Sequence, residues 1–219
     1  MSQYIRVWDL PTRLFHWSLV GLVAAMWASG EQGGEWLQYH VWCGIALAVL
    51  LLFRVLWGMA GSQTARFASF VRGPVGVLAY IKGQVTEQDN PGHNPLGGWM
   101  VVLMLLALLV QVGTGLFASD VDSYLFNGPL AARIASDLSE SLTSFHKNFF
   151  NLILALVALH VSAIIAYRVF KKQNLVRPMI TGYKQMDSKP SPLMFKPLIM
   201  AVVTLLLSGL AVYLLLTYF

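Results

Sequence analysis

The chain has 219 residues, of which 57% are hydrophobic and only 11% are charged. Because a soluble domain usually carries about 25% charged residues, this composition excludes an ordinary soluble protein and predicts an integral membrane protein. The formal net charge of +5 is then first a signal of membrane topology, and we expect no nucleic-acid partner. Cys43 is the single cysteine, which excludes an internal disulfide.

The first half of the chain predicts two apolar helices and a short surface helix. Residues 14–29 form the first, with Pro11 in a position that suits the first turn of a helix. Residues 36–57 form the second, and Arg54 near its end is expected to extend its charged head toward water. Within the polar segment that follows, residues 74–82 predict a short helix lying on the membrane surface.

A third apolar helix is predicted over residues 96–117, with Asn94 as its N-cap. Gly113 and Gly115 near the end of this helix leave room for a close neighbour. The loop that follows is acidic, and residues 131–142 within it predict a helix on the surface.

The last two apolar helices are predicted over residues 146–169 and 197–219, with a basic segment and a Pro/Ser linker between them. The fold class is therefore an all-α membrane protein, a transmembrane helix bundle with a four-helix core and a fifth C-terminal helix. We expect residues 1–177 to form the core domain and residues 178–219 to form the linker and the additional helix.

Charge predicts the orientation of the bundle. With five spans, the face that carries the N-terminus holds thirteen of the fifteen Lys and Arg residues. The positive-inside rule then places the N-terminus in the cytoplasm and the C-terminus outside. The outer face is expected to be acidic, with Glu31, Glu35, Asp120, Asp122, Asp137 and Glu140.

Four histidines fall at two matching depths in this arrangement. His146 and His160 lie 14 residues apart in one helix, about 21 Å along its axis, within the ~30 Å hydrocarbon core. His40 enters its helix from the outside and so shares the outer level with His146, while His16 enters from the inside and shares the inner level with His160. A haem iron has one axial site on each face of the ring, so the two pairs predict two six-coordinate haems.

Other interpretations of these residues stay open. The histidines could be unrelated hydrogen-bonded core residues, although ionisable groups within the membrane usually have a function. A metal other than haem iron fits less well, because no third or fourth ligand accompanies either pair. Covalent c-type haem attachment is excluded, since the chain has no Cys-x-x-Cys-His motif.

His93 precedes the third helix, where it either supports the start of that helix or handles protons at a quinone pocket. Most of the inner arginines are explained by topology, but one or two could pair with the propionates of an inner haem: Arg6, Arg13, Arg54 and Arg72. The tryptophans are expected to form an aromatic belt at the membrane surfaces: Trp8, Trp17, Trp36, Trp42, Trp57 and Trp99.

Several of these motifs resemble one family. RVWDLPTRLFHW near the N-terminus, GHNPLGGWMV at the third helix and H-x13-H in the fourth are similar to the bacterial di-haem cytochrome b561 family. That family includes the cytochrome b subunits of nickel–iron hydrogenases. The resemblance covers about residues 4–177 and implies the pairs His16 with His160 and His40 with His146, two haem b groups, a quinone substrate and a bacterial inner-membrane location.

Three functions follow from this resemblance and from the bundle. The first is electron transfer between the quinone pool and a periplasmic partner such as a c-type cytochrome or a hydrogenase-like enzyme. The second is a standalone oxidoreductase, such as a superoxide:quinone oxidoreductase. The third is a non-redox membrane anchor. The acidic outer face favours the first over the second, because it would attract a basic cytochrome and repel an anionic substrate.

Overall fold

The computed structural model describes residues 3–84, 91–120, 126–186 and 192–219. Asp122, one of the acidic residues expected on the outer face, lies outside these ranges, as does part of the Pro/Ser linker. Five long helices dominate the described chain: α1 (Leu10–Gln32), α2 (Trp36–Ala60), α5 (Pro95–Leu116), α6 (Ser136–Phe170) and α8 (Leu198–Tyr218).

Four of the long helices are long and apolar enough to cross a membrane, and they are α2, α5, α6 and α8. The chain is therefore a multi-pass helical membrane protein. The helix α1 has 23 residues but is not among these four, so the fifth span of the predicted bundle is not confirmed. Its apolar part, residues 14–29, is shorter than the roughly 20 residues that a span usually needs.

Shorter elements connect the long helices. They are β1 (Gln3–Arg6), η1 (Gln63–Ala65), α3 (Phe67–Phe70), α4 (Pro74–Ile81), η2 (Ala131–Arg133), α7 (Val176–Thr181) and β2 (Tyr183–Met186). The short helix predicted over residues 74–82 is confirmed as α4, and its place on the membrane surface stays a prediction. The one predicted over residues 131–142 is wrong, because α6 itself begins at Ser136 and runs unbroken through His146 and His160.

The chain divides into two compact units that share the long helices. Unit 1 comprises Met1–Phe15, Arg54–Met104 and Val157–Val203, and unit 2 comprises His16–Phe53, Leu105–Leu156 and Thr204–Phe219. Among the described residues, unit 1 holds twelve Lys and Arg side chains and one carboxylate, Asp9. Those of unit 2 include two cations, Arg133 and Lys147, and five carboxylates.

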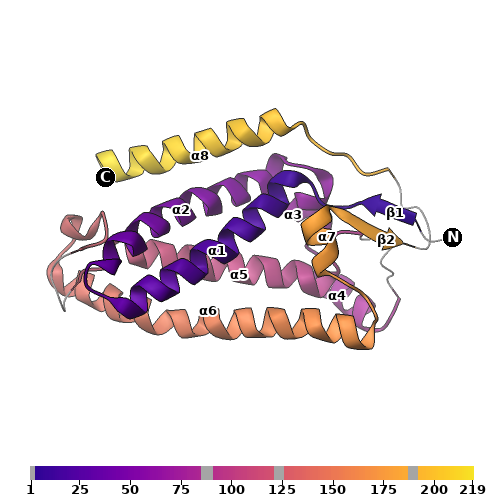
Figure 1. Ribbon diagram of the computed structural model, residues 1–219, viewed down its shortest axis with the longest axis horizontal. Helices are drawn as coiled ribbons and strands as arrows, with labels where there is room; N and C mark the ends of the chain where they lie inside the picture. The colour runs from indigo at the N-terminus through magenta and orange to yellow at the C-terminus, as the bar shows by residue number, and fades with distance from the viewer. Residues whose placement is uncertain (1–2, 85–90, 121–125, 187–191) are drawn as a thin grey trace. The chain divides into compact units, whose positions relative to one another are not determined.

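In unit 1 a small antiparallel sheet joins the beginning of the chain to the segment before α8. Gln3 pairs with Met186 and Arg6 with Tyr183, and Figure 1 shows β1 and β2 beside α7. Gly182, at φ 88°, turns the chain from α7 into β2 and accepts hydrogen bonds from Val7 N and Trp8 N through its carbonyl oxygen. Only glycine adopts this conformation without strain.

The polar core of unit 1 corrects three predictions. Arg54 is 2% exposed rather than extended toward water, because its Nη1 donates to the Ala65 carbonyl at 3.1 Å. Trp8 and Trp57 are 6% and 1% exposed and so do not belong to an aromatic belt. Trp57 Nε1 donates to Asp9 Oδ2 at 3.0 Å, which gives this indole a buried polar partner.

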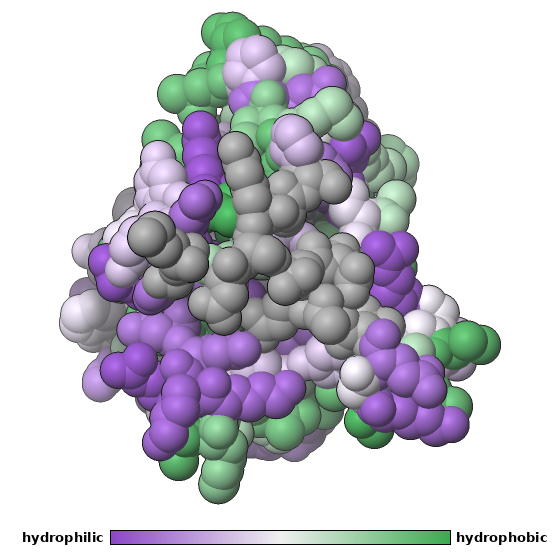
Figure 2. Space-filling view, turned by 90° about the vertical axis from the view of Figure 1, so that its right-hand side faces the viewer, coloured by the Kyte–Doolittle hydropathy of each residue, from purple (hydrophilic) through white to green (hydrophobic). Residues whose placement is uncertain are grey.

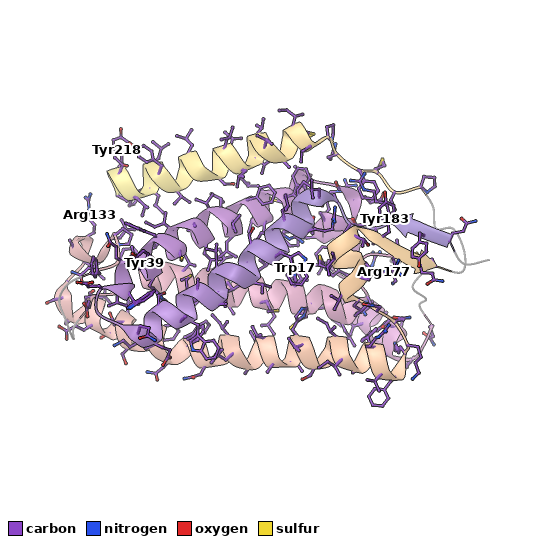
Figure 3. All side chains as sticks on the ribbon, in the orientation of Figure 1. Trp17, Tyr39, Arg133, Arg177, Tyr183 and Tyr218 are labelled. Carbon is purple, nitrogen blue, oxygen red and sulfur yellow. The ribbon has the colours of Figure 1, made fainter. Side chains whose placement is uncertain are left out.

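The segment before α8 is also bonded into unit 1. Gln63 N donates to the Met194 carbonyl at 2.9 Å, and Met194 N donates to Gln63 Oε1 at 3.0 Å. Lys196 N donates to Ser62 Oγ at 3.1 Å. Arg177, labelled in Figure 3, lies on α7, and its Nη1 donates to the Tyr4 hydroxyl at 3.0 Å, which ties α7 to β1.

Candidate haem site

His40, on the second turn of α2, is oriented by a backbone carbonyl of α1. Its Nδ1 lies 2.9 Å from the carbonyl oxygen of Met26. Because a carbonyl only accepts, Nδ1 carries the proton and Nε2 is left as the basic nitrogen. Gly30, one turn after Met26, allows this approach, since a Cβ there would lie 3.3 Å from Nδ1 of His40.

His146, on α6, is oriented in the same way by α5. Its Nδ1 lies 2.9 Å from the carbonyl oxygen of Gln111 and 3.2 Å from Thr114 Oγ1. The side-chain amide of Gln111 donates to Nε2 at 3.2 Å, which agrees with Nε2 being the basic nitrogen. A Cβ at Gly115 would lie 2.8 Å from Cε1 of His146, so glycine is required there.

The structure brings these two imidazoles together within unit 2. Their ring centroids are 6.1 Å apart, with 80° between the ring planes. A metal–imidazole bond is about 2.0–2.1 Å long, and a ring centroid lies about 1.1 Å beyond its nitrogen, so opposed imidazoles on one metal have centroids about 6.2–6.4 Å apart. The two imidazoles are therefore close enough that both would hold one metal-containing group.

A cavity of about 210 Å³ adjoins both histidines. Six glycines line it: Gly30, Gly33, Gly34, Gly44, Gly115 and Gly128. Within the described ranges no group of three or more His, Cys, Asp or Glu side chains could hold a bare metal ion. Two imidazoles beside a glycine-lined cavity instead suit a flat prosthetic group that brings its own equatorial ligands.

The predicted inner pair is distributed over the two units. His16 belongs to unit 2, where its ring contacts that of Trp17 edge to face at 5.0 Å, and His160 belongs to unit 1. Because α6 is continuous, His160 follows His146 by 14 residues, or about 21 Å along the helix. The pairing of His16 with His160 stays a prediction.

His93 is packed between aromatic rings in unit 1. Its ring centroid lies 4.6 Å from that of Trp8 and 4.4 Å from that of Phe70. Its Nδ1 atom is buried and, among the described residues, has no hydrogen-bond partner. Burial, with smaller effects of Arg54 and His160, lowers the pKa of His93 to about 3. These contacts support a structural role before α5, where Asn94 Oδ1 accepts from Gly97 N at 2.7 Å and so confirms the predicted N-cap.

The sequence did not reveal the residues that orient the outer pair. Met26 and Gln111 orient the rings through carbonyl oxygens, which every residue has and which leave no signal in the sequence. The side-chain amide of Gln111, which also contacts His146, could have provided one. Gly115 was expected to leave room for a neighbour, and this is confirmed, whereas a Cβ at Gly113 would meet nothing within 4 Å. The propionate contacts suggested for Arg6, Arg13, Arg54 and Arg72 stay predictions.

Comparison with known proteins identifies relatives. The sequence model of a family described as prokaryotic cytochrome b561 matches residues 7–182. The chain is 25% identical over 179 residues to a probable superoxide oxidase CybB of Yersinia pestis, which covers 75% of this chain and 90% of that protein. It is 25% identical over 213 residues to a probable Ni/Fe-hydrogenase B-type cytochrome subunit of Rhizobium leguminosarum bv. viciae, covering 82% of this chain and 88% of that protein.

A protein of the same description from Bradyrhizobium diazoefficiens is 24% identical over 217 residues, which covers 83% of this chain and 86% of that protein. No solved structure matches the chain significantly.

Proposed function

The chain belongs to the prokaryotic cytochrome b561 family of haem-binding electron-transport membrane proteins, and from this we propose that it carries electrons across the membrane through two b-type haems. The donors and acceptors would be the quinone pool and a periplasmic redox partner. When bound, haem iron supplies one-electron redox chemistry.

The observation that carries this proposal is the outer imidazole pair. His40 and His146 have Nε2 as the basic nitrogen, and with ring centroids 6.1 Å apart these two side chains would hold one haem. The carbonyl oxygens of Met26 and Gln111 hold each ring in one tautomer and one orientation. Such second contacts raise the basicity of an imidazole ligand and limit its movement.

His16 and His160 would form the second pair. His160 lies on the same helix as His146, so α6 would contribute one ligand to each haem. We assign the di-haem domain to residues 1–177, and the linker with its additional helix to residues 178–219.

We place the protein in the bacterial inner membrane, with the N-terminus in the cytoplasm and the C-terminus in the periplasm. The charges of the two units support this orientation. Among the described residues, every charged side chain of unit 1 except Asp9 is a Lys or an Arg. In unit 2, most of the charged side chains are carboxylates. Lys and Arg accumulate on the cytoplasmic side of membrane proteins.

The acidic residues of unit 2 also suggest the kind of partner. Glu31, Glu35, Asp137 and Glu140 are exposed, whereas Asp120 is buried. Exposed carboxylates attract a basic protein surface and raise its rate of association. A basic c-type cytochrome or a hydrogenase-like enzyme fits this face, and two relatives are described as hydrogenase cytochrome subunits.

The alternative is a standalone superoxide:quinone oxidoreductase, because another relative is described as a probable superoxide oxidase. The acidic residues argue against it, since superoxide is an anion. Stopped-flow mixing of the purified protein with superoxide distinguishes the two. A haem reduction rate near the diffusion limit would support the alternative, and a slow rate would support the partner protein.

Haem content tests the proposal directly. The purified protein should contain two b-type haems per chain, and His40→Ala and His146→Ala should each lose the same one. Likewise His16→Ala and His160→Ala should each lose the other. His93→Gln serves as the control and should keep both, because His93 packs against Trp8 and Phe70 outside the proposed ligand set. The proposal fails if the wild-type chain binds one haem or none, or if the double variant H40A/H146A loses both.

A further inference from the structure

The short helix α4 in unit 1 is exposed along an apolar face. None of its residues is buried, and Val75, Leu78 and Ile81 are 83%, 51% and 63% exposed. Spaced three residues apart, these side chains lie within one sector of about 120° on the helix. In water such a face would be unfavourable, because apolar area stays hydrated.

The opposite side of α4 is bonded to the ends of two candidate spans. The hydroxyls of Tyr80 on α4 and Tyr167 on α6 are 2.5 Å apart. Tyr167 also accepts a hydrogen bond of 2.7 Å from Nδ2 of Asn94, whose Oδ1 caps α5. Tyr167 is three residues before the end of α6, so α4 is attached where α5 begins and α6 ends. This is the level of a membrane surface, and an apolar face exposed there contacts lipid.

Cations surround the same corner. Lys171 Nζ donates to the Tyr80 hydroxyl at 3.3 Å and lies 5.3 Å and 4.8 Å from the ring centroids of Tyr80 and Tyr167. These contacts position its ammonium group over the junction of α4 and α6. Lys82 follows α4 directly, and Lys172 follows Lys171.

Carboxylates do not offset this charge in the described part of unit 1. Asp9 is the sole carboxylate there, and it is 2% exposed and bonded to Trp57 and Thr12. Glu87 and Asp89 lie in the range 85–90, outside the described residues. Figure 2 shows hydrophilic side chains gathered on the face of this unit that carries β1, β2 and α7.

We propose that the junction of α4 and α6 binds an anionic phospholipid. Its phosphate lies beside Lys82 and Lys171, which follow α4 and α6, and its acyl chains lie against the apolar face of α4. Neither feature suffices alone: the apolar face accepts any acyl chain, and the lysines select a negatively charged headgroup. Basic clusters beside a membrane-surface helix recognise anionic lipids in this way.

Native mass spectrometry of the full-length protein released from detergent tests the site. Phosphatidylglycerol and phosphatidylcholine with the same acyl chains are the probes. Phosphatidylglycerol should remain bound, and Lys171→Gln and Lys82→Gln should each lower its affinity about fivefold, the effect of one cation near a membrane surface. Ile81→Gln should weaken both lipids. Circular dichroism and the elution volume show whether each variant is folded.

Lys196→Gln is the matched control, because it removes the same charge from unit 1 on the segment before α8. It should retain phosphatidylglycerol like the wild type. Equal retention of the two lipids, or equal losses in Lys196→Gln and Lys171→Gln, would overturn the proposal. It would also be overturned if the lipid-free protein formed a dimer that Ile81→Gln disrupts, because the face would then bind a second copy.

Discussion

The outer site predicts a graded response to three glycine-to-alanine substitutions. A Cβ at residue 115 would lie 2.8 Å from Cε1 of His146, one at residue 30 would lie 3.3 Å from Nδ1 of His40, and one at residue 113 would meet nothing within 4 Å. Replacing glycine by alanine stabilises a helix by about 1 kcal/mol, and all three positions are helical. The three variants therefore share the same local effect and differ in what the added methyl group contacts.

The displacement of His146 follows from these distances. Carbon atoms in contact are about 3.5–4.0 Å apart, so Gly115→Ala must move the ring away from α5 by at least about 0.7 Å. The Nδ1 atom of His146 is 2.9 Å from the Gln111 carbonyl on the same helix. A shift of about 0.7 Å lengthens that distance to about 3.6 Å at most, which is beyond hydrogen bonding when the ring moves along the line from Nδ1 to the oxygen. Loss of such a bond costs about 1 kcal/mol, or about fivefold in haem affinity.

Haem titration of the apoprotein, followed by absorbance, measures this affinity. Gly115→Ala should weaken the outer site at least fivefold, Gly30→Ala should weaken it less, and Gly113→Ala should bind both haems like the wild type. The midpoint potential of the outer haem should shift in the same order, because each ring loses its fixed orientation. Equal affinities in Gly115→Ala and Gly113→Ala would refute the role of the Gln111 carbonyl.

Three further predictions concern stability and docking. Asp9→Ala should lower the free energy of unfolding by about 2–3 kcal/mol, since it removes the buried carboxylate that accepts from Trp57 Nε1 and Thr12 N, and an unchanged melting temperature would contradict this. The pKa of His93 is about 3 in the folded chain and 6.5 in the unfolded chain. As the pH falls from 6.5 toward 3, His93 is therefore protonated in the unfolded chain before the folded one, and the free energy of unfolding decreases. At pH 5 the loss reaches at most about 2 kcal/mol and should disappear in His93→Gln, as measured by thermal unfolding at several pH values. Reduction by a basic periplasmic cytochrome should slow as salt rises, and less steeply in a Glu31→Gln/Glu35→Gln variant, whereas equal salt dependence would exclude docking on these residues.

The long helices could be predicted from the sequence because apolar runs of span length have few alternatives in a membrane. The start of α6 could not. Residues 136–145 are polar, so they were separated from the apolar run, yet SDLSESLTSF contains neither glycine nor proline. Nothing in this stretch ends a helix, and α6 extends through it to Ser136.

The polar core of unit 1 was missed for a different reason. Trp8, Trp57 and Arg54 have the residue types of a membrane surface, and sequence position alone placed them there. Trp57 and Arg54 find buried partners in Asp9 and in the Ala65 carbonyl, and Trp8 packs against the ring of His93. The pairing of β1 with β2 joins residues about 180 positions apart, and no local pattern indicates such a contact.

Both outer histidines are oriented by the same arrangement, a helix carbonyl with a glycine four residues later. His40 bonds to the carbonyl of Met26, and Gly30 is four residues later; His146 bonds to the carbonyl of Gln111, and Gly115 is four residues later. In an α-helix the carbonyl of residue i accepts from the N–H of residue i+4, so a side chain at i+4 would stand beside that oxygen. Glycine at i+4 leaves room for an imidazole to reach the carbonyl oxygen, which also accepts from the hydroxyl of residue i+3, Ser29 or Thr114. The carbonyl cannot be recognised in a sequence, but the glycine can. A glycine four residues after a helical position that faces a histidine therefore indicates a carbonyl that orients the imidazole.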